Sequence, residues 1–328
     1  MNNINKTKGQ ESNNQKTEEI TNAILYEQCD LLAKFNKIPF DLTERIYDHA
    51  KTITNIKKNN FMDVLPSQET CVRLSKIPEQ SSDFINANWI FDKYIATQQP
   101  NNFTIIDFWR MVFETRAPII CNLNGNDNYL PDNSQNIFNK SIQSNQVINP
   151  INIKIENEIK KKNYTVRKIC LSLYTVSHFL THITFYAWPD RSVPEFDDFK
   201  NLFDIVELKT FCVNISKESP MIVHCKAGVG RTGTFILIHH IMFLLERKEP
   251  FNIIKLIKNM RTSRTSMVQG EIQFKFVLKF LATKIITNNS IGKLNLTSSL
   301  DSSFVCDNFA HNKFNKKFLT MSSGIMSH

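Results

Sequence analysis

The sequence predicts an α/β protein in which a twisted, mixed central sheet is flanked by helices. Helical and strand-like patterns alternate from residue 22 to residue 287 with no Gly/Pro/Ser linker, which indicates one domain built around a sheet. A hydrophobic fraction of 41% and a charged fraction of 22% are typical of a globular chain with a buried core. No run approaches the roughly 20 apolar residues of a membrane-spanning helix, and no apolar leader begins the chain. We therefore expect neither a membrane span nor export.

Apolar residues at helical spacing mark the expected helices. They lie at 22–36, 41–53, 104–114, 196–216, over about 14 residues from 232, and at 270–286.

Short apolar and β-branched runs mark the expected strands. They lie at 118–123, 147–155, 163–173, 179–187 and 221–224. Residues 57–72 are expected to form a loop and a short strand, and the Asn-rich segment 124–146 to be irregular. The polar arm 1–21 and the Ser/Asn/Lys-rich tail 288–328 have no periodicity, which predicts disorder at both ends.

Charge and cysteine content narrow the function classes. The net charge of +9 suits an anionic partner such as a nucleic acid, an acidic lipid surface or phosphorylated groups. The 7 cysteines form no C-x-x-C pair, so they indicate neither a disulfide framework nor a zinc ribbon. Such a chain suits the reducing cytosol, where one cysteine can be a nucleophile.

The segment His224-Cys-Lys-Ala-Gly-Val-Gly-Arg-Thr-Gly-Thr234 carries the strongest functional signal. A predicted strand enters it and a predicted helix leaves it, so its backbone N–H groups and the helix N-terminus create an anion site. The same positive field favours the thiolate of Cys225, and the planar fork of Arg231 suits two phosphate oxygens. Thr232 can hydrogen-bond the sulfur when it becomes a leaving group. We expect phosphate to be bound by Lys226, Ala227, Gly228, Val229, Gly230, Arg231 and Thr232.

This segment matches H-C-x-x-G-x-x-R-[ST]-G and resembles the signature of cysteine-dependent protein tyrosine phosphatases of the tyrosine-specific, non-receptor type. The likeness covers residues 22–287. Further motifs similar to this family are a phosphotyrosine-recognition loop at 55–66, core strands at 83–88 and 94–98, a core helix at 107–112, an acid loop at 188–190 and a glutamine loop at 267–273. The resemblance implies hydrolysis of phosphotyrosine in partner proteins by a cytoplasmic monomer, through a phosphocysteine on Cys225, without a metal ion or another cofactor and without nucleic acid.

The resemblance also identifies the predicted acid. Expulsion of a tyrosyl oxygen requires protonation, and a carboxylic acid on a closing loop meets this need and later takes a proton from water. Asp190 stands at that position, with Trp188 and Pro189 as hinge and anchor of the loop.

Two glutamines and a histidine complete the implied chemistry. Gln269 is similar to the family glutamine that orients the hydrolytic water, and Gln273 is a second candidate. His224 is expected to support the thiolate through hydrogen bonding rather than to act as a general base.

Substrate selection is expected to depend on a deep slot. Phosphotyrosine carries its phosphate farther from the backbone than phosphoserine does, so a deep slot with an aromatic wall selects it. Phe61 occupies the wall position, where the family usually has tyrosine, and Asp63 would hold two backbone N–H groups of an extended peptide. Lys57, Lys58 and Lys226 would favour acidic flanking sequences.

Some positions depart from the family pattern. Asn60 stands where arginine is usual, and Gln99 replaces a glycine. The segment after Leu123 lacks K-C-x-x-Y-W-P and its supporting acidic residue, and keeps only 129–131. What braces Arg231 is therefore open.

Two alternatives remain beside the enzyme. A phosphotyrosine-binding trap with little or no turnover follows from the altered bracing segment. An RNA 5′-phosphatase follows from the basic charge, but it predicts a shallow pocket without the aromatic loop, so the sequence disfavours it. The altered motifs and high asparagine content also resemble the tyrosine phosphatases of insect-infecting bracoviruses, which would act in the host cytoplasm.

Overall fold

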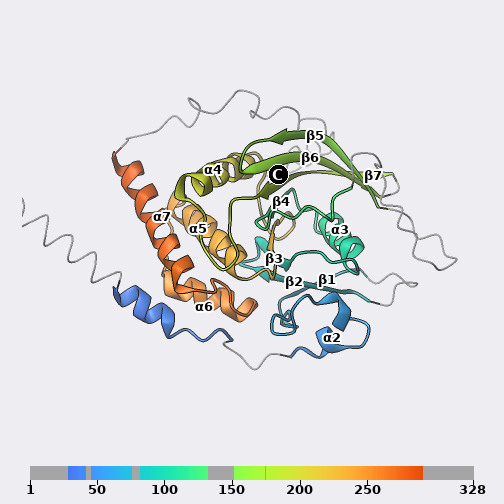
Figure 1. Cartoon of the computed structure of the whole chain (residues 1–328), viewed down its shortest axis with the longest axis horizontal. Coiled ribbons are helices and arrows are strands. Elements are labelled where there is room, and N and C mark those ends of the chain that lie inside the picture. Colours follow the sequence, from blue (N-terminus) through green and yellow to red (C-terminus); the bar gives the residue numbers. More distant parts are fainter. Residues whose placement is uncertain (1–28, 42–45, 76–81, 132–150, 174, 291–328) are drawn as a thin grey trace, which may run out of the picture. The chain divides into compact units, whose positions relative to one another are not determined.

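A mixed eight-stranded sheet with the order β1-β2-β3-β8-β4-β7-β6-β5 forms the centre of the fold (Figure 1). Its four central strands, β3, β8, β4 and β7, run parallel, and antiparallel pairs extend the sheet on both sides. The strands are β1 (Cys71–Arg73), β2 (Phe84–Ile90), β3 (Tyr94–Gln98), β4 (Ile119–Asn122), β5 (Asn152–Lys160), β6 (Tyr164–Leu173), β7 (Val176–Phe185) and β8 (Met221–Cys225). The predicted α/β class with a mixed sheet is confirmed.

The computed structural model describes residues 29–41, 46–75, 82–131, 151–173 and 175–290. The arm predicted at 1–21 and nearly all of the tail predicted at 288–328 lie outside these ranges. The chain divides into two compact units at residue 283, and the sheet lies in the first.

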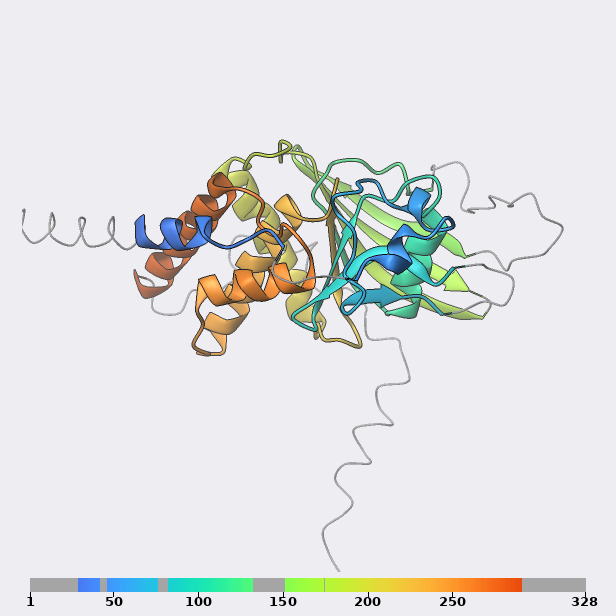
Figure 2. The same cartoon turned by 90° about the horizontal axis from the view of Figure 1, so that it is seen from below.

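Helices cover both faces of the sheet. α3 (Ile105–Glu114) lies on one face, and α4, α5, α6 and α7 lie on the other (Figures 1 and 2). The bounds of these four are Phe196–Cys212, Gly230–Glu246, Ile253–Ser263 and Glu271–Ser290. Three helical segments of the described residues precede β1: residues 29–36, which lie within the helix predicted at 22–36, α2 (Asp48–Lys51) and the 3₁₀ helix η1 (Ile56–Lys58). Within the described part of the chain, no helix has both the length and the apolar character needed to cross a bilayer.

Phenylalanines join the helical layer. The Phe199 ring of α4 lies 5.0 Å from the rings of both Phe276 and Phe280 of α7, and 6.2 Å from Phe235 of α5. These edge-to-face contacts add to the free energy of apolar burial. They fix α5, whose first residues belong to the predicted phosphate loop.

The structure corrects several predicted boundaries. Where a helix was expected at 41–53, the described residues show only α2, which has no side-chain N-cap. Of the strand expected at 147–155, residues 147–150 lie outside the described ranges. β5 begins at Asn152 and continues beyond residue 155 to Lys160, because it pairs with β6 along its whole length. Helix α6 was not predicted, although Asn252 caps it by accepting from the Lys255 N–H and its apolar residues recur at helical spacing.

The sheet topology positions the loop from Cys225 to Arg231, called the Cys–Arg loop below. β8 lies between β3 and β4 and ends at Cys225, and α5 begins at Gly230. The loop therefore lies at the C-terminal end of a central parallel strand, where ligands bind in open α/β sheets.

Candidate active site

Close backbone packing shapes the loop after Cys225. Gly228 has a φ of +72°, and a Cβ atom there would lie 2.2 Å from the Thr97 carbonyl oxygen on β3. Only glycine tolerates both the left-handed conformation and this approach. The loop is therefore held against the neighbouring strand.

Arg264 holds the same loop from the other side. Its Nε donates to the Gly228 carbonyl oxygen at 2.9 Å and its Nη2 to the Ala227 carbonyl oxygen at 3.0 Å. The same guanidinium also donates to the side-chain oxygens of Asn88 at 2.7 Å and Asn86 at 2.8 Å. This fully buried guanidinium was not identified from the sequence, where no motif surrounds it.

The loop forms one wall of a cavity of about 110 Å³. Most predicted catalytic and substrate-binding residues line it together, although they come from four separate segments of the chain. The lining residues are Phe61, Asp63, Val64, Asp190, Arg191, Cys225, Lys226, Ala227, Val229, Gly230, Arg231, Gln269 and Gln273.

Other predicted site residues lie behind this surface. Trp188 is buried, with its ring 5.4 Å from that of Phe199 and its indole N–H donating to the Ser192 carbonyl oxygen at 3.0 Å. It thus anchors the loop that it shares with Pro189. Thr232 is fully buried, and its hydroxyl oxygen has no hydrogen-bond partner among the described residues.

The guanidinium of Arg231 is buried and points to the acid loop. Its Nη1 donates to the Trp188 carbonyl oxygen at 3.0 Å, and its Nη2 lies 3.0 Å from Asp190 Oδ1. A third contact joins Nη2 to Asn124 Oδ1 at 3.4 Å. The Arg231 side chain is 5% exposed and that of Asp190 is 56% exposed, so the carboxylate lies at the mouth of the cavity.

His224 is held behind the cysteine by a buried phenol. Tyr129 Oη lies 2.7 Å from Nε2 of His224 and 2.6 Å from Nε2 of His182. Burial lowers the pKa of both histidines to about 3 and raises the pKa of Tyr129 well above its ordinary value. All three groups are therefore neutral at physiological pH, which suits His224 for a supporting role and not for proton abstraction. His182 and Tyr129 were not predicted as partners.

The two glutamines lie against the loop. The Gln269 backbone N–H donates to Gln273 Oε1 at 3.0 Å. A Cβ atom on Gly230 would lie 3.0 Å from Gln273 Nε2 and 3.2 Å from Gln269 Oε1. Glycine at 230 thus lets both amides approach the Cys–Arg loop.

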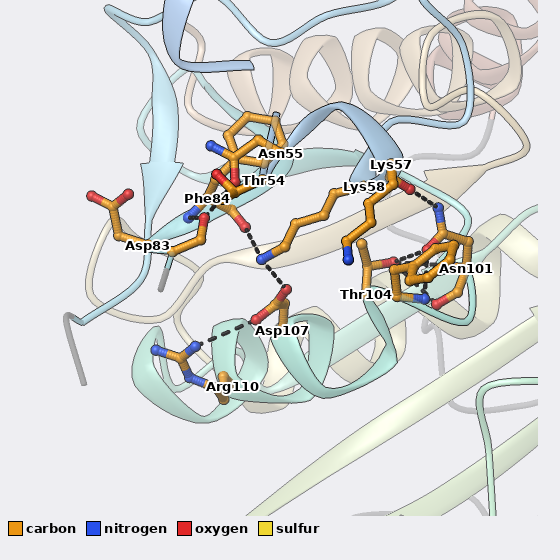
Figure 3. Close-up of polar contacts among 12 residues, drawn as sticks. Thr54, Asn55, Lys57, Lys58, Asp83, Phe84, Asn101, Thr104, Asp107 and Arg110 are labelled. Atoms are coloured by element: carbon orange, nitrogen blue, oxygen red, sulfur yellow. Dashed lines mark hydrogen bonds and ion pairs between the residues drawn. The ribbon is translucent and has the colours of Figure 1, made fainter. Parts of the chain in front are cut away.

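The recognition loop at 55–66 is fastened to α3 (Figure 3). Lys58 Nζ lies 2.7 Å from Asp107 Oδ2, and Arg110 Nη1 lies 3.3 Å from Asp107 Oδ1. Burial raises the pKa of Asp107, and the two cations oppose this shift. The prediction that Lys58 favours acidic flanking sequences is therefore wrong, because its ammonium faces inward to Asp107. Lys57 lies with its ammonium 5.2 Å from the Phe103 ring.

A larger and more open hollow of about 820 Å³ adjoins the cavity. It shares Phe61, Asp190, Lys226 and Arg231 with the cavity, and carboxamide side chains provide most of the remaining wall. These carboxamides are Asn60, Gln99, Asn101, Asn102, Asn124, Asn126 and Asn128.

Comparison with known proteins agrees with this geometry. The family model described as protein-tyrosine phosphatase matches residues 55–283. The chain is 33% identical over 251 residues to human tyrosine-protein phosphatase non-receptor type 12, covering 73% of this chain and 32% of that protein. It is 30% identical over 267 residues to mouse receptor-type tyrosine-protein phosphatase epsilon, covering 76% and 36% respectively. The chain thus spans about a third of the length of these relatives.

The family match covers the recognition loop, the acid loop, the Cys–Arg loop and the glutamine loop. Taken with the mixed sheet and the shared cavity, it shows that the chain belongs to the protein-tyrosine phosphatase family.

Proposed function

We propose that this chain hydrolyses phosphotyrosine in proteins through a phosphocysteine on Cys225. The observation that carries the proposal is the convergence of Cys225, Arg231 and Asp190 on one cavity of about 110 Å³. A nucleophile, an oxyanion-binding fork and a proton donor around one small cavity are the groups that phosphoryl transfer requires.

The first step transfers the phosphoryl group to the enzyme. The Cys225 thiolate attacks phosphorus, and a sulfur–phosphorus bond forms as the bond to the tyrosyl oxygen breaks. Arg231 and the loop N–H groups hold the non-bridging oxygens. Asp190 gives its proton to the departing oxygen, so tyrosine leaves as a neutral phenol.

The second step regenerates the cysteine. Water attacks phosphorus, Asp190 accepts the proton of that water, and the sulfur–phosphorus bond breaks to release inorganic phosphate and the thiolate. Gln269 lines the cavity and has an amide that can orient this water. Neither step changes an oxidation state.

The residues at the slot support the proposed preference for phosphotyrosine. Phe61 is half-buried at the cavity, and Asp63 is exposed at its edge. Phe61 would stack on the substrate ring, and Asp63 would accept from backbone N–H groups of the peptide. Phosphotyrosine-containing proteins are the proposed partners, and the cytoplasm is the proposed location because a thiolate nucleophile needs a reducing compartment.

Phosphate release from a phosphotyrosyl peptide in the presence of EDTA tests the proposal. Wild-type protein should release phosphate, whereas Cys225→Ser should bind the peptide without turnover. Cys170→Ser, which changes another free cysteine on β6, should behave as wild type. Asp190→Ala should lower kcat by about 10²–10⁴-fold, as loss of a general acid does. Tight binding by the wild-type protein without release would favour the trap instead.

A further inference from the structure

The three hydrogen-bond partners of the Arg231 guanidinium lie on two different segments of the chain. Trp188 and Asp190 belong to the same acid loop, so both of their contacts depend on the position of that loop. Asp190 must also leave the guanidinium when a phosphate dianion takes its place. Among the described residues, Asn124 is the remaining partner, and it follows β4 on a different segment.

The segment that carries Asn124 is tied to the sheet. The Leu123 N–H donates to the His224 carbonyl oxygen at 2.8 Å, directly before the nucleophile. The Asn124 N–H donates to Asn122 Oδ1 at 2.9 Å, at the end of β4. Asn124 therefore keeps a fixed distance from the phosphate loop.

Gln99 sets which end of the Asn124 carboxamide faces Arg231. Gln99 Oε1 accepts from Asn124 Nδ2 at 3.1 Å. With its donor end occupied, Asn124 presents its oxygen to the guanidinium. The opposite orientation would bring two sets of N–H donors together.

Gln99 is itself immobilised by contacts with three segments. Its backbone N–H donates to the Lys226 carbonyl oxygen at 3.2 Å, and its backbone oxygen accepts from Asn60 Nδ2 at 2.7 Å. Its Nε2 donates to the Asn126 carbonyl oxygen and to Asn128 Oδ1, both at 3.1 Å. With 7% exposure, this side chain joins the phosphate loop, the recognition loop and the segment after β4.

We propose that Gln99 and Asn124 are positioning residues for phosphate binding, Gln99 acting through Asn124 and Asn124 through Arg231. The inference rests on the proposed function of Arg231. A neutral carboxamide holds the guanidinium in place without neutralising it, so the full positive charge remains available to the phosphate dianion. Gln99 and the segment after Leu123 both depart from the family pattern. In this proposal they act together to hold the Arg231 guanidinium in place.

Protection of Cys225 by inorganic phosphate tests the inference without requiring turnover. Full-length protein is treated with iodoacetamide, and alkylation at Cys225 is followed by mass spectrometry at increasing phosphate concentrations. Asn124→Ala and Gln99→Met should each need about tenfold more phosphate for half protection, within the 10²-fold that a displacement of about 1 Å can cost. Their alkylation rates without phosphate should match wild type. Asn201→Ala, an exposed asparagine on α4, is the matched control and should not differ from wild type.

The double variant tests the order of action. If Gln99 acts only through Asn124, the double variant should need no more phosphate than Asn124→Ala alone. Effects that multiply, or wild-type protection in either single variant, would overturn the inference, as would an altered alkylation rate without phosphate. Should Gln99→Met fail to fold, Gln99→Ala replaces it under the same criteria. Failure of the wild-type protein to release phosphate from a phosphopeptide would count against the proposed function. The protection assay could still be interpreted in that case, because it measures phosphate binding and requires no turnover.

Discussion

Tyr129→Phe removes one oxygen atom that joins two buried histidines behind the nucleophile. The hydroxyl lies 2.6 Å from His182 Nε2 and 2.7 Å from His224 Nε2, and both imidazoles are fully buried and neutral. The single phenolic hydrogen serves one nitrogen, and the oxygen accepts from the other. Phenylalanine fills the same space but leaves one buried donor and one buried acceptor unsatisfied.

The expected cost follows from these two groups. An unsatisfied buried polar group costs about 1–3 kcal/mol, so Tyr129→Phe should lower the free energy of unfolding by roughly 2–6 kcal/mol. Tyr94→Phe is the matched control, because Tyr94 is equally buried and its hydroxyl contacts one imidazole, His239 Nδ1, at 2.8 Å. That variant should cost roughly 1–3 kcal/mol.

The two variants should also differ in catalysis. His224 adjoins Cys225, so loss of its hydroxyl partner should lower kcat/KM for a small aryl phosphate by about tenfold through misplacement of the sulfur. Tyr94 pairs with Met221 at the opposite end of β8, four residues or about 13 Å from the cysteine, and its variant should keep wild-type kcat/KM. Urea unfolding and steady-state kinetics measure both quantities. Equal destabilisation by the two variants, or equal loss of activity, would refute the bridging role of Tyr129.

Other predictions concern the slot, the loop and pH. Phe61→Ala should raise KM for phosphotyrosyl peptides and reduce their advantage over small aryl phosphates. Asp63→Ala should weaken the binding of peptides but not that of small aryl phosphates. Similar kcat/KM values of the wild-type protein for phosphoserine and phosphotyrosine peptides would show a shallow pocket instead. Gly228→Ala should abolish phosphate protection of Cys225, because its Cβ would lie 2.2 Å from the Thr97 carbonyl oxygen; protection at wild-type phosphate concentrations would contradict this packing. Three buried histidines have a pKa of about 3 in the fold, against about 6.5 in the unfolded chain. As the pH falls below about 6.5, the unfolded chain therefore takes up protons that the native state does not, and the difference approaches three protons between about pH 5.5 and pH 4. Their contribution to the free energy of unfolding should fall on acidification, by up to about 4 kcal/mol per pH unit, and an unfolding free energy that is constant from pH 7 to 5 would contradict their burial. These histidines are His182, His224 and His239.

The centre of the site was predictable because its residues are close together in the sequence. β8, the loop and α5 are contiguous from Met221 to Glu246, so a buried strand, two glycines and a helical run suffice to place Cys225 and Arg231 at the end of a strand. The family likeness added the distant segments, and the structure brings Phe61, Asp190 and Gln269 to the same cavity. Helix α6 is also marked by local signals in the sequence, namely the capping residue Asn252 and apolar residues at helical spacing.

Contacts between distant segments were not predictable in this way. The Arg264 guanidinium binds Asn86, 178 residues earlier in the chain, and an isolated arginine carries no sign of such a partner. Lys58 was expected to face the substrate, but the ammonium pairs with Asp107 of α3, because a half-buried lysine needs a counter-charge more than an exposed one does.

The sequence by itself therefore determined the fold class, the Cys–Arg loop and the family, because each depends on residue types at fixed spacing along the chain. Only the tertiary structure decided what holds Arg231 and His224. The family pattern drew attention to Gln99 and to residues 129–131, but nothing in the sequence indicated which side chains they or Asn124 contact. Those hydrogen bonds exist only once β3, β4, β7 and β8 lie side by side. Buried polar groups must find partners wherever the chain path brings them, and that path is a property of the whole sheet.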